Sequence, residues 1–131
     1  MKLVKQTGND CSIACIAMLS GRALEEVSNL LPRPINEGLY LDDVRGLLFK
    51  VGLQFIQYTD FITIHGRTYL LTVPSKSKTQ WHDIVLSYSE EGVPTILDPL
   101  EGISETYTIK DLQDKAMIHQ LIEILNPVEE N

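Results

Sequence analysis

The spacing of apolar residues changes near Gly52. Before this residue, apolar side chains recur every three or four positions, which is typical of helices. After it, short runs rich in Val, Ile, Thr and aromatic residues are separated by turn-forming residues, which is typical of strands. Helices followed by strands indicate an α+β fold. We therefore expect N-terminal helices packed on an antiparallel β-sheet.

Three helices are expected before Gly52. The first, CSIACIAMLS, is apolar nearly all round, with Asn9 or Asp10 as its N-terminal cap and Gly21 at its end. The second is amphipathic and stops before Pro32, because proline cannot continue a helix. The three segments are residues 11–20, 23–31 and 41–52.

Strand-like runs follow, and the C-terminal region is less clear. The runs cover residues 53–58, 61–64, 68–73, 82–88 and 93–98, with a hairpin turn at His65-Gly66-Arg67. Residues 104–115 suggest a short strand that leads into a short helix. Residues 116–125 fit both a helical face and a strand, and their isoleucines favour a strand.

Length and charge narrow the class of protein. The chain of 131 residues is the size of one domain, 1–131, with a helical part at about 10–52, a sheet part at about 53–125 and a frayed tail at 126–131. The net charge of −7, with 11 scattered basic residues, argues against nucleic-acid binding. No run approaches the ~20 apolar residues of a membrane span, and no signal peptide is recognisable. We expect a cytoplasmic protein.

Two cysteines are present, Cys11 and Cys15. Their spacing matches neither a zinc site nor a disulfide framework. Cys15, flanked by Ala14 and Ile16, is expected to be an inert core residue. Cys11 instead falls at the first turn of the first helix, where backbone amides and the helix dipole favour a thiolate. It is therefore a candidate nucleophile.

A cysteine nucleophile needs a base, a group that orients the base, and donors for the oxyanion. His82 begins the strand-like run QWHDIVLSY and Asp98 ends the next one, VPTILDP, so the two lie close if these strands pair in antiparallel fashion. Asp98 could then fix the imidazole tautomer. Gln6 precedes Cys11 closely enough to donate its side-chain amide to the oxyanion. We expect these four residues to form one site.

Several other residues compete with this set. His65 lies in the hairpin turn and His119 in an apolar terminal segment, so neither is expected to be the base. Asp83 competes with Asp98 as the orienting group, but alternation along a strand places it on the face opposite the imidazole. Trp81 is expected to pack, with a substrate contact as the alternative. The sequence has no metal-ligand pattern, and no cofactor is expected.

The segment QTGNDCSIACIAM, residues 6–18, resembles the N-terminal motif of papain-like cysteine peptidases. The branch it resembles contains the double-glycine leader peptidases of bacteriocin exporters and small stand-alone bacterial and phage relatives. The similarity extends to LSGRALEEV and to WHDIVLSYSEEGVPTILDP. It implies a papain-like fold, with Cys11 as nucleophile, His82 as base and later acid, Asp98 as the orienting residue and Gln6 as oxyanion donor.

One residue departs from the family's pattern, because Ser12 stands where a glycine commonly follows the nucleophile. Its side chain is a hypothetical obstacle to substrate access. The resemblance implies hydrolysis of a peptide or isopeptide bond through a thioester, with a peptide or protein as substrate. The sequence does not separate hydrolysis from acyl transfer to another amine. The alternative is a catalytically inactive papain-like module that binds a partner protein or a peptide tail.

Overall fold

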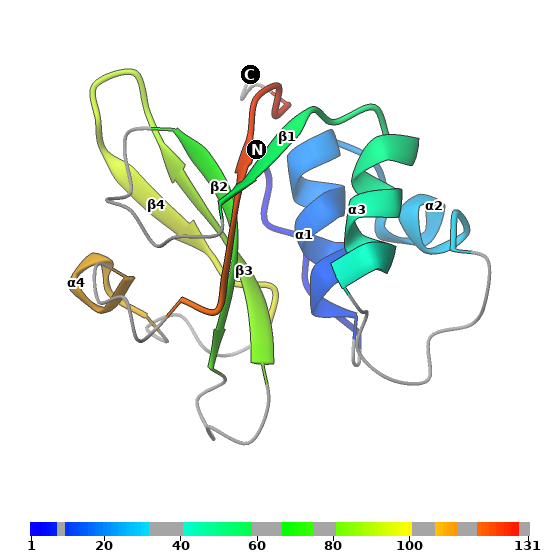
Figure 1. Cartoon of the computed structure of the whole chain (residues 1–131), viewed down its shortest axis with the longest axis horizontal. Coiled ribbons are helices and arrows are strands. Elements are labelled where there is room, and N and C mark those ends of the chain that lie inside the picture. The colour runs from blue at the N-terminus through cyan, green and yellow to red at the C-terminus, as the bar shows by residue number, and fades with distance from the viewer. Residues whose placement is uncertain are drawn as a thin grey trace.

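The computed structural model describes residues 1–7, 10–31, 41–58, 67–74, 81–100, 107–112 and 118–128. Three helices gather on one side of a β-sheet, and a short fourth helix lies on its other side (Figure 1). The α+β class is confirmed. In chain order the elements are α1 (Cys11–Ser20), α2 (Leu24–Ser28), α3 (Leu41–Lys50), β1 (Phe55–Tyr58), β2 (Thr68–Pro74), β3 (Trp81–Tyr88), β4 (Pro94–Leu97), α4 (Ile109–Leu112) and β5 (Gln120–Ile124).

The helix α1 is the most deeply buried helix that the structure describes. Residues 12–19 are all buried, and the helix contacts α2, α3 and β3. An apolar sequence without a polar face suits this central position. Gly21 ends the helix with a left-handed φ of 73° and donates its N–H to the Ala17 carbonyl. The predicted span of this helix is confirmed.

Asp10 directly precedes α1, but its side chain does not cap the helix. Its carboxylate accepts hydrogen bonds from the backbone N–H and the hydroxyl of Thr7, both at 2.8 Å. Asp10 is thus the N-cap residue of α1, as one of the two predicted candidates, but its side chain makes no capping hydrogen bond because a local turn competes for the carboxylate. The other candidate cap, Asn9, lies outside the described residues.

The five strands pair in antiparallel fashion in the order β1-β5-β2-β3-β4. The ambiguous C-terminal segment supplies β5, which lies between β1 and β2, and its residues 121–124 are all buried. A strand covered on both faces loses the alternation of apolar and polar residues, so its spacing resembles a buried helix. The prediction of a strand here is confirmed.

Apolar side chains cover both faces of the sheet. On one face β2, β3 and β5 pack against α1, α2 and α3, and on the other they pack against α4. The strand β3 is therefore held from both sides, and a side chain at its start is placed by a rigid element. Its inward residues are Val85 on the helix side and Ile84 and Leu86 on the α4 side.

Some predicted segments differ in length. The second helix ends at Ser28 rather than at residue 31. Leu30 and Leu31 each donate their N–H to the carbonyl three residues earlier, which forms a tighter turn. The short helix predicted near residue 110 is present as α4. The predicted strand at 61–64, the hairpin turn at His65-Gly66 and the start of the strand predicted from residue 104 lie outside the described residues.

The beginning of the C-terminal tail is anchored. The Asn126 side chain accepts a hydrogen bond from Gln54 N–H at 2.6 Å and donates one to the Gly52 carbonyl at 3.1 Å. Val128 N–H donates to the Leu19 carbonyl of α1 at 2.8 Å. The tail predicted to fray from residue 126 is thus held to the protein through residue 128.

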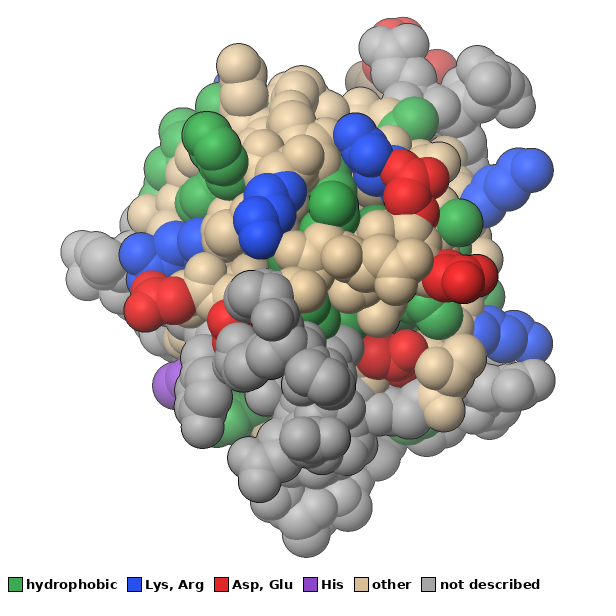
Figure 2. All heavy atoms as spheres, turned by 90° about the vertical axis from the view of Figure 1, so that its right-hand side faces the viewer, with side chains coloured by type: hydrophobic (Ala, Val, Ile, Leu, Met, Phe, Trp, Pro, Cys, Tyr) green, Lys and Arg blue, Asp and Glu red, His purple; other side chains and the backbone are tan. Residues whose placement is uncertain are grey.

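The helix side of the molecule carries charges of both signs. Figure 2 shows Lys and Arg side chains interspersed with Asp and Glu across the described residues of this face. Arg22 and Glu26 form an exposed ion pair of 2.7 Å, one helical turn apart. Such pairs contribute less than ~1 kcal/mol to stability, so this face is ordinary solvated surface.

Candidate active site

The turn before α1 places Cys11 at the start of a buried helix. The contacts between Thr7 and Asp10 hold the chain ahead of the helix, and the Asp10 carbonyl accepts a hydrogen bond from Ala14 N–H at 2.9 Å. Cys11 is partly exposed, whereas the residues that follow are buried. The first amides of a helix lack partners within the helix and carry the positive end of its dipole. Cys11 lies at this end of α1.

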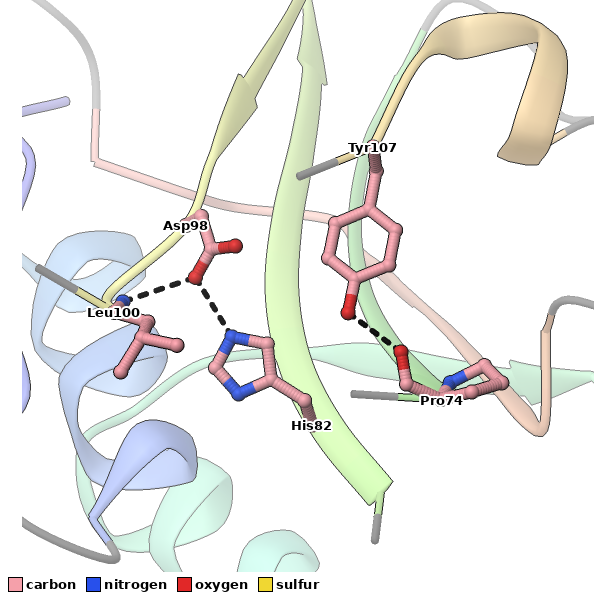
Figure 3. A network of polar contacts seen from close by, with 5 residues as sticks. All are labelled: Pro74, His82, Asp98, Leu100 and Tyr107. Carbon is pink, nitrogen blue, oxygen red and sulfur yellow. Dashed lines mark hydrogen bonds and ion pairs between the residues drawn. The ribbon is translucent and has the colours of Figure 1, made fainter. Parts of the chain in front are cut away.

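His82 and Asp98 meet because of the register of β3 and β4. The pairing of these strands, continued by one residue, sets Asp98 opposite Ile84 and on the same face as His82. His82 Nε2 lies 2.7 Å from Asp98 Oδ1, and the two side chains are 8% and 9% exposed. The same oxygen accepts a hydrogen bond from Leu100 N–H at 2.9 Å (Figure 3). The predicted contact between His82 and Asp98 is confirmed.

Cys11 lies close enough to the imidazole of His82 to raise its pKa. Because Nε2 faces Asp98, Nδ1 is the nitrogen that remains for the sulfur. Burial alone lowers the pKa of His82, but the hydrogen bonds to Asp98 and Cys11 and the charges of these groups outweigh it and raise the pKa to about 9. A pKa of about 9 favours the imidazolium form of His82 at neutral pH.

The titration of His82 is expected to be shifted strongly. A folded-state pKa of about 9, against the ordinary 6.5, stabilises the fold fully below about pH 6.5, and this stabilisation is lost as the pH rises through about 9. Nuclear magnetic resonance of the imidazole should show a midpoint near 9, and Asp98→Asn should lower it. A His82 midpoint near 6.5 in the wild-type protein contradicts the hydrogen-bonded pair.

Gln6 lies beside the segment that carries Asp98. Its backbone N–H donates to the carbonyl of Pro99 at 2.7 Å, and its side-chain oxygen is buried. This bond ties the N-terminal segment to the residue that follows Asp98. The segment before Cys11 and the segment after Asp98 are thereby joined.

Asp83 and Cys15 are not partners in the hydrogen bond between His82 and Asp98. Asp83 accepts hydrogen bonds from Ser12 and Thr72, on the face away from the imidazole, as alternation along β3 predicts. Cys15 is fully buried, and burial raises the pKa of its thiol well above the ordinary value, as do the nearby charges of Asp83, Cys11 and Asp98. Cys15 is therefore held as an unreactive thiol.

Of the other two histidines, the structure describes His119. His119 stacks on Trp81, with ring centroids 4.1 Å apart and planes inclined by 14°. Trp81 packs in this way while 52% of its surface stays exposed. His65 lies outside the described residues.

Two features near the site were missed by sequence reasoning. Tyr107 is buried, its hydroxyl donates to the Pro74 carbonyl at 2.5 Å, and burial, followed by the charges of Asp98 and Cys11, raises its pKa to about 12 (Figure 3). Nothing in its sequence neighbours marks it. The second feature is the contact between Ser12 and Asp83, for which the unusual serine after Cys11 was the available signal.

The described residues contain neither a metal-binding cluster nor a membrane span. Within these residues, no three His, Cys, Asp or Glu side chains converge as metal ligands would. Of the helices described, none has the length and apolar character needed to cross a bilayer.

The chain has the fold of a peptidase domain. Among solved structures it is similar to the crystal structure of the peptidase domain of Streptococcus ComA, a bifunctional ABC transporter involved in a quorum-sensing pathway. The match has a TM-score of 0.69 and 18% sequence identity, and it covers 97% of this chain and 98% of that domain. No family model and no curated protein matches the sequence. The peptidase-domain fold implied by the resemblance is confirmed.

Proposed function

We propose that this chain is a cysteine peptidase, which hydrolyses a peptide or isopeptide bond through a thioester intermediate. The observation that carries the proposal is the hydrogen bond between His82 and Asp98, with Cys11 at the start of α1 close enough to raise the pKa of His82. The likeness to a peptidase domain over nearly the whole chain supports it.

In the resting site Cys11 is the thiolate partner of the His82 imidazolium. The sulfur attacks the carbonyl carbon of the substrate, a C–S bond forms, and one electron pair of the carbonyl moves onto its oxygen. His82 then gives its proton to the leaving amine as the C–N bond breaks, which leaves a thioester on Cys11. Water attacks the thioester with His82 as the base, and the acid product and the free site are released.

Asp98 and Gln6 support these steps. Asp98 holds Nε2 of the imidazole, which keeps Nδ1 directed at the sulfur and stabilises the imidazolium. The Cys11 N–H and the Gln6 side-chain amide donate to the oxyanion. The bond from Gln6 N–H to Pro99 supports this role because it ties Gln6 to the strand end that carries Asp98.

The substrate proposed for the chain is a peptide or a flexible protein segment. The structural neighbour is the peptidase domain of a transporter, which supports a peptide bond as the target. The competing idea of an inactive binding module rested on Ser12 as an obstacle beside the nucleophile. Ser12 is only 6% exposed and its hydroxyl is directed at Asp83, so this serine does not favour the alternative.

A peptide library tests the proposal. Wild-type protein and Cys11→Ala are incubated with the same mixture of unstructured peptides, and cleavage products are identified by mass spectrometry. We expect products that appear only with the wild-type protein. Identical product patterns for the two proteins, or no products over a broad library that includes small-residue sites, count against a peptidase.

A further inference from the structure

A buried polar contact joins the helix that carries Cys11 to the strand that carries His82. Ser12 Oγ donates a hydrogen bond to Asp83 Oδ2, and Thr72 Oγ1 donates one to Asp83 Oδ1 at 2.7 Å. Thr72 lies directly opposite Asp83 in the pairing of β2 with β3. We call these three residues the Ser12–Asp83–Thr72 bridge.

The bridge lies one residue away from each partner of the reactive pair. Ser12 follows Cys11 at the start of α1, and Asp83 follows His82 at the start of β3. Because side chains alternate along a strand, Asp83 faces α1 while His82 faces Asp98. The bridge and the reactive pair therefore both link the start of α1 to the start of β3.

The apolar contacts between α1 and the sheet fix position only loosely. Residues such as Ile16 and Val85 belong to the shared core, and apolar contacts of this kind have no preferred direction. A hydrogen bond to a carboxylate restricts distance and angle together. The Ser12–Asp83 contact is thus a directional constraint next to a pair whose spacing decides proton transfer.

Because Asp83 is buried, its carboxylate needs the hydrogen bonds that Ser12 and Thr72 donate. The residue is 7% exposed, and a buried carboxylate without donors is unfavourable. Burial raises the pKa of Asp83, while the hydrogen bonds from Ser12 and Thr72 and the charge of His82 act in the opposite direction. The two hydroxyl donors therefore hold the carboxylate, and through it the helix start, in one place.

We propose that Ser12 and Asp83 are positioning residues, which hold the Cys11 sulfur within hydrogen-bonding reach of His82 through a bridge braced by Thr72. The inference rests on the proposed function, since it assigns a role toward the same Cys11 and His82 pair. It also explains the serine after the nucleophile as half of a pair whose other half is Asp83.

The test measures the rate of Cys11 alkylation by iodoacetamide at about pH 7, located by mass spectrometry, together with kcat and KM for any peptide cleaved. Ser12→Ala and Asp83→Val are expected to lower the alkylation rate and kcat by roughly 10- to 100-fold, with a smaller effect on KM, because the reactive atoms are displaced. Ser12→Thr retains the hydroxyl, and Asp83→Asn retains the shape and an acceptor for Thr72. Both are expected to stay within roughly threefold of the wild-type rate.

A matched control removes a comparable contact at the other end of the same strands. Ser87 and Thr68 share a hydroxyl–hydroxyl hydrogen bond of 3.1 Å between β3 and β2. Ser87→Ala should leave the alkylation rate of Cys11 unchanged. Thermal melting of each variant shows that rates are compared on folded protein, and if Asp83→Val does not fold, Ser12→Ala decides the question.

The outcomes separate this inference from the proposed function. If wild-type Cys11 reacts no faster than an ordinary thiol, the proposed function fails. If wild-type Cys11 is fast and Ser12→Ala is equally fast, the bridge has no positioning role while the peptidase proposal stands. If Asp83→Asn is as slow as Asp83→Val, the charge of Asp83 rather than its placement is what matters, and the inference is overturned.

Discussion

Replacing Cys11 by alanine is expected to lower kcat/KM for peptide hydrolysis by ~10⁴-fold or more, because the thioester cannot form without the sulfur. The helix start remains intact, since alanine suits the first turn of α1 and the buried residues 12–19 are unchanged. Hydrolysis of a peptide identified from the library, followed by chromatography, measures the loss.

Cys15→Ala is the matched control for this loss. It removes the other sulfur of the chain, one helical turn away and fully buried. It is expected to lower the free energy of unfolding by about 1 kcal/mol through the cavity that it leaves, with kcat/KM within roughly twofold of the wild-type value. Equal losses of activity in the two variants contradict a specific role for Cys11.

Replacing His82 by alanine is expected to lower kcat by ~10²–10⁴-fold, because it removes both the proton acceptor and the proton donor of the reaction. In the wild-type protein the rate should fall as the pH rises through about 9, where His82 loses the proton that stabilises the thiolate and protonates the leaving amine. The pH–rate profile of hydrolysis checks this limb. The variant should lack it.

His119→Ala is the corresponding control. This histidine stacks on Trp81 and is exposed, so its removal should leave kcat and the pH profile unchanged. Asp98→Asn should lower kcat more than His119→Ala does and less than His82→Ala does. Its alkaline limb should move to lower pH because the carboxylate no longer supports the imidazolium. A wild-type profile without an alkaline limb near 9 is inconsistent with His82 as the proton donor.

The contact between His82 and Asp98 was predictable because it depends on local rules. Each residue stands at the end of a strand-like run, and antiparallel pairing brings such ends together. The exclusion of Asp83 as the orienting residue followed from alternation in the same way. The candidate nucleophile Cys11 could be placed at a helix start because it opens an apolar run that is long enough to be a helix.

Features that depend on distant contacts were not predictable. The sequence does not specify that β5 lies between β1 and β2, because strand order is decided by how the whole chain packs. A local choice was also missed, because the carboxylate of the N-cap residue Asp10 binds Thr7, three residues earlier, instead of the first amides of α1. The serine at position 12, where the family commonly has glycine, could not be explained from the sequence. Its hydrogen-bond partner, Asp83, lies 71 residues away along the chain.

The central claim is that Cys11 is held as an activated nucleophile by His82, and competitive alkylation with limiting iodoacetamide tests it most directly. Peptide mapping by mass spectrometry gives the modification rates of Cys11 and Cys15 in the same native sample across pH. We predict that Cys11 is modified first, that it reacts rapidly even at about pH 6, where an ordinary thiol is almost entirely protonated, and that Cys15 stays unmodified. Modification of Cys11 at about pH 6 no faster than that of a small-molecule thiol, or no faster than that of Cys15, contradicts the claim.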